Sequence, residues 1–150
     1  MKFHTLSVVL LVFALAVSGC GSAPTASASN ASPEPTTVED QAGLVAALEA
    51  AGATVEVGDS ITQVFFSPEG NILKVNGADV QVFEYESVEA MENEASQVAP
   101  DGGSIGTSMV TWVDTPHFYK AGRIIVLYVG SDETILSLLE QMLGPQFAGR

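Results

Sequence analysis

The stretch IIVLYV, Ile124–Val129, is the part of the sequence that decides the fold, because all six of its side chains are apolar. Alternate side chains of a strand point to opposite faces of a sheet. Ile124, Val126 and Tyr128 therefore point one way, and the other three point the opposite way. A strand that is apolar on both faces lies in the middle of a sheet with both faces covered. We expect helices over one face, and over the second a further layer of this chain, a dimer partner or a ligand groove.

Two β-hairpins are predicted around this central strand. The segments ILKV (72–75) and VQVFEY (80–85) flank Asn76-Gly77-Ala78-Asp79. An Asn-Gly pair between two apolar runs is typical of a tight hairpin turn. The second hairpin joins 117–120 to 123–129 around Ala121-Gly122. Shorter strands are expected at 54–57, 61–66 and 109–113, with Gly58-Asp59-Ser60 dividing the first two.

Three helices complete the expected set. The first begins after Thr37 as N-cap and ends at Gly52, with apolar residues at helical spacing between them. The second runs from Ser87 to Pro100, and the third from Ser131 to Gly144. The order is α-β-β-β-β-α-β-β-β-α. It predicts an α+β fold with a mainly antiparallel sheet.

The N-terminal residues are typical of a secretory signal peptide. One positive charge is followed by an apolar run at 6–17, which is shorter than the roughly 20 residues that span a bilayer. The run ends in Val17-Ser18-Gly19-Cys20, which resembles the lipobox of bacterial lipoproteins. The resemblance implies a signal peptide at 1–19, cleavage before Cys20, a diacylglycerol thioether on Cys20 and usually acylation of the new amino group.

Two other interpretations of this region remain open: an ordinary signal peptide that is cut near Ser18 or Gly19, and an uncleaved signal anchor. Cys20 is the only cysteine, so it cannot form an internal disulfide, and this favours the lipobox. Residues 20–37 are then a stalk rich in Ser, Ala, Thr and Pro, predicted to be disordered. A single extracytoplasmic domain, 38–150, follows it, anchored to the membrane by lipid and facing outward.

The charge of the chain excludes some partners. Eighteen acidic and five basic residues give a net charge of −13, and removal of the signal peptide takes away Lys2 and no acid. Nucleic-acid binding depends on Lys and Arg that neutralise phosphates, so we expect none. Docking on anionic lipid headgroups is disfavoured for the same reason. The acidic surface serves either a basic or cationic partner or solubility outside the cell.

The candidate site residues lie in DTPHFYK, at 114–120. His117 is the only histidine after the signal peptide, with Asp114 before it and Tyr119 after it. This set suits general acid–base work or a weak metal site with carboxylates. The alternative is structural: Asp114 caps a turn, and His117 begins an edge strand. On a strand, His117 and Tyr119 share one face and Phe118 takes the other.

A glycine-rich loop, PDGGSIGTS at Pro100–Ser108, is the second candidate. Backbone N–H groups of such a loop can hold an anion. The loop lacks the lysine of a Walker A motif and does not fit G-x-G-x-x-G after a strand, so a connecting or binding loop is favoured. No catalytic nucleophile, cofactor motif or metal motif is evident, and we expect no enzyme and no cofactor. An exposed stripe of Tyr85, Trp112 and Tyr119 would instead indicate a binding face.

The body of the chain resembles small bacterial lipoproteins of unknown function. The resemblance is carried by LVAALEAAGATVE, VNGADVQVFEY, PDGGSIGT and PHFYKAGRIIVLYVG, and it covers Leu44–Phe147. It implies a shared domain and location and transfers no catalytic residue. Two functions follow: a membrane-tethered accessory or protein-binding module for an envelope partner, or a small-ligand or cation-binding lipoprotein. The ligand site of the second would lie near Pro100–Ser108 and Asp114–Tyr119.

Overall fold

The computed structural model describes residues 37–150. The predicted signal peptide, the lipidation site Cys20 and nearly all of the predicted stalk lie outside the described residues. Within 37–150, no helix combines the length and the apolar character that crossing a bilayer requires.

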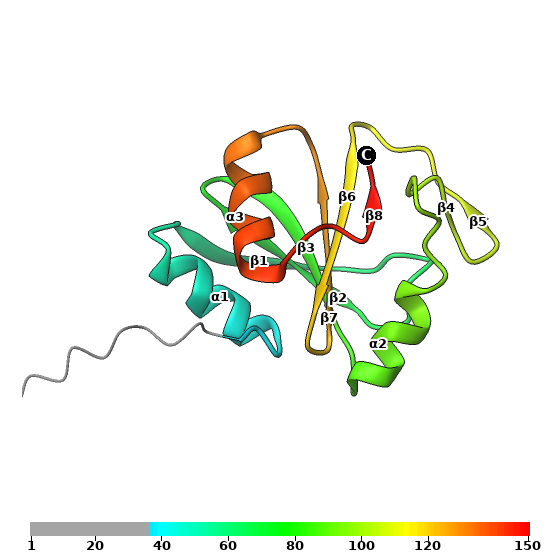
Figure 1. The fold of residues 1–150 in the computed structure, drawn as a ribbon, viewed down its shortest axis with the longest axis horizontal. Helices are drawn as coiled ribbons and strands as arrows, with labels where there is room; N and C mark the ends of the chain where they lie inside the picture. The colour runs from blue at the N-terminus through cyan, green and yellow to red at the C-terminus, as the bar shows by residue number, and fades with distance from the viewer. Residues whose placement is uncertain (1–36) are drawn as a thin grey trace, which may run out of the picture. The chain divides into compact units, whose positions relative to one another are not determined.

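The fold is a six-stranded antiparallel sheet with three helices (Figure 1). The strand order is β1-β2-β3-β7-β6-β8, and β4 pairs with β5 in a separate two-stranded sheet. The helices are α1 (Gln41–Ala50), α2 (Val88–Ala95) and α3 (Glu133–Leu143). The strands are β1 (Val55–Ile61), β2 (Gly70–Val75), β3 (Ala78–Glu84), β4 (Ser104–Ile105), β5 (Ser108–Met109), β6 (Pro116–Ala121), β7 (Ile124–Val129) and β8 (Ala148–Gly149). The α+β class, the mainly antiparallel sheet and the three helices are confirmed.

The predicted centre of the sheet is also confirmed. Strand β7, the IIVLYV stretch, lies between β3 and β6, with Val126 paired to Val82 on one side and to Tyr119 on the other. The first five side chains of β7 are buried. The apolar pattern on both faces of β7 therefore correctly identified a central strand that is paired on both edges and buried on both faces.

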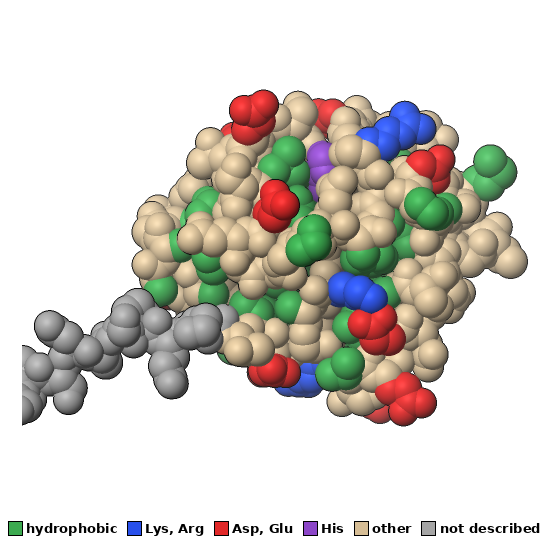
Figure 2. Space-filling view, in the orientation of Figure 1, with side chains coloured by type: hydrophobic (Ala, Val, Ile, Leu, Met, Phe, Trp, Pro, Cys, Tyr) green, Lys and Arg blue, Asp and Glu red, His purple; other side chains and the backbone are tan. Residues whose placement is uncertain are grey.

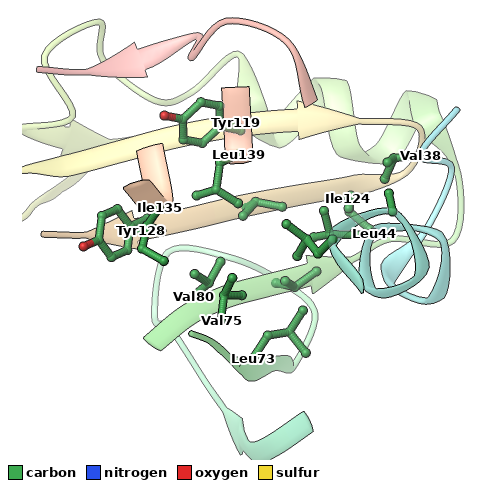
Figure 3. Close-up of a cluster of buried hydrophobic side chains, with 14 residues drawn as sticks. Val38, Leu44, Leu73, Val75, Val80, Tyr119, Ile124, Tyr128, Ile135 and Leu139 are labelled. Atoms are coloured by element: carbon green, nitrogen blue, oxygen red, sulfur yellow. The ribbon is translucent and has the colours of Figure 1, made fainter. Parts of the chain in front are cut away.

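Helices α1 and α3 cover one face of the sheet (Figure 1). Figure 3 shows the apolar side chains that meet beneath them, among them Leu44, Leu73, Val80, Ile135 and Leu139. The N-cap of α1 is Asp40, whose side chain accepts a hydrogen bond from Gly43 N at 2.9 Å. The expectation that Thr37 caps this helix was wrong. A carboxylate at Asp40 supplies the required acceptor closer to the first turn.

The second face of the sheet is covered by this same chain. Helix α2, the turn at 62–66 and the β4–β5 region pack on it, as Figure 1 shows for α2 and β4–β5. Phe83, Phe118, Ile125 and Leu127 are fully buried there. We expected all three helices on one face, and α2 corrects that expectation. The sequence left three possible covers for this face: a further layer of this chain, a dimer partner or a ligand groove. The structure shows the further layer of this chain.

Local differences concern short strands. The chain from Val55 to Ile61 forms one strand, with an irregular register between Val57 and Ser60, where two strands were expected. Residues 62–69 form turns instead of the predicted strand at 61–66. The predicted strand at 109–113 shrinks to Ser108–Met109, and β8 was not anticipated.

Both predicted hairpins form. Asn76 and Gly77 carry φ values of 50° and 87° between β2 and β3, as a tight turn of this kind requires. Gly122, with φ 49°, turns the chain between β6 and β7. The backbone of Glu39 lies directly against Gly122, and Glu39 O accepts a hydrogen bond from Arg123 N at 2.9 Å.

Candidate functional site

A polar cleft of about 430 Å³ lies between the loop after α2 and the segment that leads into β6. We call it the Trp112 cleft. Its lining residues are Asp101, Gly103, Val110, Thr111, Trp112, Asp114, Thr115, Pro116 and Arg150. Its volume lies within the roughly 300–1,000 Å³ that is usual for small-molecule sites. The cleft joins parts of the two segments that the sequence indicated: Asp101 and Gly103 of the glycine-rich loop, and residues 114–116 of the second segment.

The glycine-rich loop forms one wall of the cleft because its turn is held on the sheet. Asp101 Oδ1 accepts a hydrogen bond from Gly103 N at 2.9 Å. Gly102 is buried with φ 69°, and a β-carbon there would press on Phe118 and Pro116 at 3.0 and 3.1 Å. The loop therefore needs glycine at 102 to lie this close to β6.

Three backbone N–H groups of the same loop, which could have held an anion, already donate hydrogen bonds within the protein. Gly102 N donates to Ala99 O, Gly103 N to the Asp101 side chain, and Gly106 N to Gln97 O. These N–H groups are engaged within the protein and do not form the open cradle that a phosphate needs.

Trp112 is half-buried, and its orientation is set by three contacts. Its Nε1–H donates to Gly102 O at 2.7 Å. Its ring packs edge-to-face on Phe65 and Phe118, with centroids 6.0 and 5.7 Å away. Both arrangements are favourable for aromatic pairs. The indole therefore presents a fixed apolar surface to an otherwise polar cleft.

Charged groups of both signs line the cleft. Asp114 is exposed, and its Oδ1 accepts a hydrogen bond from Thr115 N at 2.7 Å. Arg150 reaches the cleft because β8 pairs with β6 and Arg150 N donates to Pro116 O at 3.2 Å. Arg150 could not be predicted as a site residue, because the two-residue strand β8 before it leaves no periodic signal in the sequence.

His117 does not lie in the cleft. Its side chain is only 6% exposed, and both ring nitrogens have partners. Nδ1 is 2.7 Å from Gln146 Oε1, and Nε2 is 3.1 Å from Gly130 O. The ring stacks on Tyr128. In the described part of the chain, Asp114 makes no hydrogen bond to His117, so the anticipated Asp–His pair is not formed.

Tyr119 shares the α1/α3 face with His117, while Phe118 points to the other face, as the strand period predicted. Tyr119 is 3% exposed, and burial followed by the charge of Glu140 raises its pKa. His117 and Tyr119 line a separate hollow of about 290 Å³ below the end of α3. Of the three candidate residues, Asp114 thus lines the Trp112 cleft, whereas His117 and Tyr119 line the separate hollow.

An exposed stripe of Tyr85, Trp112 and Tyr119, which would have indicated a binding face, is not formed on the surface of 37–150. Tyr85 is 4% exposed, and its hydroxyl donates to Glu94 Oε2 at 2.8 Å. Burial and the Glu94 carboxylate raise the pKa of Tyr85. Tyr85 and Tyr119 belong to the two cores, and of these three aromatic residues only Trp112 is partly exposed.

A larger groove of about 670 Å³ lies beside α1, between Val45 and Val57. Three of its polar residues already bond to each other: Gln41 N donates to Glu84, and Asn71 donates to the Gln41 side chain. Among residues 37–150, no three His, Cys, Asp or Glu side chains are placed to hold a metal ion. The Trp112 cleft is the better candidate, because it brings charged groups of both signs together beside an oriented aromatic ring.

The acidic residues do not gather into one patch on the face that Figure 2 draws, where they are dispersed and some lie beside Lys or Arg side chains. No protein-family model, curated protein or solved structure matches this chain.

Proposed function

We propose that this protein is a lipid-anchored, outward-facing lipoprotein whose domain binds a small polar ligand in the Trp112 cleft. The observation that carries the proposal is the meeting of the Pro100–Ser108 loop with Asp114 around a rigid, half-exposed tryptophan. Ligand sites typically combine an apolar surface with a few polar groups that fix orientation. The Trp112 cleft offers both.

The lipid anchor rests on the lipobox at Val17–Cys20. Two or more acyl chains hold a protein stably on a membrane, whereas one is marginal. Cys20→Ser should move the protein from the membrane to the soluble fraction, and the intact mass should lose the acyl groups. Equal membrane retention of the Cys20→Ser variant would contradict lipidation.

A binding role without catalysis is supported by how the domain uses its reactive groups. The ring nitrogens of His117 are both engaged, and the burial of Tyr85 and Tyr119 disfavours their ionised forms. A general acid or base must reach the proton that it moves. These three side chains are buried within the domain and do not line the Trp112 cleft.

A second candidate function is the accessory or protein-binding module. It is favoured by two apolar side chains on the segment that borders the cleft, Met109 and Val113, which are 92% and 99% exposed. Apolar side chains that are exposed to this degree are compatible with a protein contact. Met109→Ser with Val113→Ser should abolish co-purification of an envelope partner and leave small-ligand binding intact.

Thermal unfolding of the full-length protein in detergent micelles tests the leading proposal. A ligand at 100 times its Kd adds about 2.7 kcal/mol of stability. For a domain of this size that raises Tm by several degrees. We expect a saturable rise with one class of small polar ligand, lost in Trp112→Ala and retained in the exposed control Val113→Ala. No rise with any ligand class would contradict the proposal.

A further inference from the structure

Opposite charges line the Trp112 cleft without pairing across it. Asp101 and Asp114 supply carboxylates and Arg150 a guanidinium. Within 37–150, every ion pair closer than 4.0 Å involves one of the other cations, which are Lys74, Lys120 and Arg123. Arg150 is thus the one Lys or Arg of the described chain with no Asp or Glu carboxylate within 4.0 Å. The cleft leaves room for a molecule that carries both charges.

The two carboxylates also keep unused acceptors. In each of them Oδ1 accepts one backbone hydrogen bond, from Gly103 N or from Thr115 N. Among the hydrogen bonds of residues 37–150, none reaches the Oδ2 atom of Asp101 or Asp114. A ligand ammonium would find two charged acceptors there. The indole of Trp112 adds a cation–π surface, which attracts an ammonium within about 6 Å of the ring.

Arg150 suits the other end of such a ligand. A guanidinium presents a planar fork of N–H donors that matches a carboxylate in two parallel hydrogen bonds. A hydrogen bond from Arg150 N to Pro116 O holds the Arg150 backbone against β6, and its exposed side chain lines the cleft. A carboxylate that docks on Arg150 would sit in the same cleft as an ammonium at Asp101 and Asp114.

We propose that the Trp112 cleft binds zwitterionic amino acids or short peptides, with the ligand carboxylate on Arg150 and the ligand ammonium between Asp101, Asp114 and Trp112. This inference rests on the proposed ligand-binding function and names its ligand class. A ligand that is only cationic would leave Arg150 unpaired beside it, and one that is only anionic would face two carboxylates. A neutral sugar would desolvate all three charges without neutralising any of them.

The test uses Trp112 itself, because it is the only tryptophan in the chain. Its fluorescence in the full-length protein, held in nonionic micelles, therefore reports on this cleft without a label. The titrants are diglycine, N-acetyl-diglycine, diglycine amide and glucose. Each charge-assisted hydrogen bond contributes roughly 1.5–3 kcal/mol. We expect diglycine to bind at least about tenfold more tightly than either blocked dipeptide, and glucose to bind more weakly still.

Two variants assign the charges. Arg150→Gln should give diglycine and diglycine amide equal affinities, because this substitution removes the guanidinium that binds the ligand carboxylate. Asp114→Asn should reduce the advantage of diglycine over N-acetyl-diglycine. Lys74→Gln and Asp59→Asn, which remove one exposed charge of each sign outside the cleft, should leave the discrimination unchanged. The Tm of each variant verifies that it folds.

The outcomes separate this inference from the function on which it rests. Equal affinities for diglycine and both blocked forms would overturn the proposal that the cleft binds the ammonium and the carboxylate of one ligand together. Saturable binding of glucose in place of diglycine would overturn the zwitterionic class and retain the small-ligand function. An unchanged Trp112 fluorescence and Tm with every titrant would overturn both.

Discussion

The close contact of Gly122 with Glu39 makes a quantitative prediction. A β-carbon at Gly122 would lie closer than 3.0 Å to three backbone atoms of Glu39, in a turn with φ 49°. Gly77 has φ 87° in the other hairpin, and a β-carbon there meets nothing within 4 Å. The two glycines therefore share the left-handed conformation and differ in the contact, so Gly77→Ala is a matched control.

The size of each effect follows from these contacts. An alanine in the left-handed region costs about 1–2 kcal/mol, which is all that Gly77→Ala should lose. Gly122→Ala adds the displacement of Glu39, which breaks its hydrogen bond to Arg123 N at about 1 kcal/mol and pulls the buried Val38 outward. Fully burying a valine contributes about 1.5–3 kcal/mol, of which a part is lost. We expect Gly122→Ala to cost about 3–5 kcal/mol.

Urea and thermal unfolding of the full-length protein, followed by far-UV circular dichroism, measure both variants. At roughly 4 °C per kcal/mol, Tm should fall by about 12–20 °C for Gly122→Ala and by about 4–8 °C for Gly77→Ala. Equal losses in the two variants would show that the segment before α1 does not pack on the β6–β7 turn. Our account of how α1 is fastened to the sheet would then be wrong.

Three further predictions test the second face and the titrating groups. Phe118→Ala, at a fully buried position, should cost about 3–5 kcal/mol in urea unfolding, and the exposed Val113→Ala less than about 0.5; similar costs would contradict the buried second face. The hydrogen bond from Gly43 N and the neighbouring Arg123 lower the pKa of Asp40, so its stabilisation is present above its ordinary pKa of 3.8. The difference in unfolding free energy between wild type and Asp40→Asn should shrink as pH falls through the lower folded pKa, and a constant difference would refute this. Burial raises the pKa of Tyr85, so wild-type stability should fall as pH rises above the usual tyrosine pKa of about 10, and less steeply in Tyr85→Phe; parallel curves would argue against it.

The features that the sequence predicted well are those with a local cause. The unbroken apolar run IIVLYV and the Asn76-Gly77 pair are both local signals, and they identified the central strand and the hairpin. The irregular register near Ser60 was missed because glycine and polar residues there suit a turn as well as a distorted edge strand.

The features that escaped prediction depend on contacts between distant residues. The apolar pattern of α2 shows which of its sides is buried but not which face of the sheet receives it. The role of His117 is decided by Gly130 and Gln146, which are 13 and 29 residues away in sequence. Arg150 joins the Trp112 cleft only through the pairing of β8 with β6.

The most direct test of a ligand site in the Trp112 cleft is a map of backbone amide shifts. Proton–nitrogen NMR spectra of the full-length protein in micelles would be recorded with increasing diglycine. We expect saturable shifts at 101–103, 111–115 and Arg150, and unchanged amide shifts along the α1 groove at Val45 and Val57. Shifts confined to the α1 groove, or no saturable shifts at all, would contradict it.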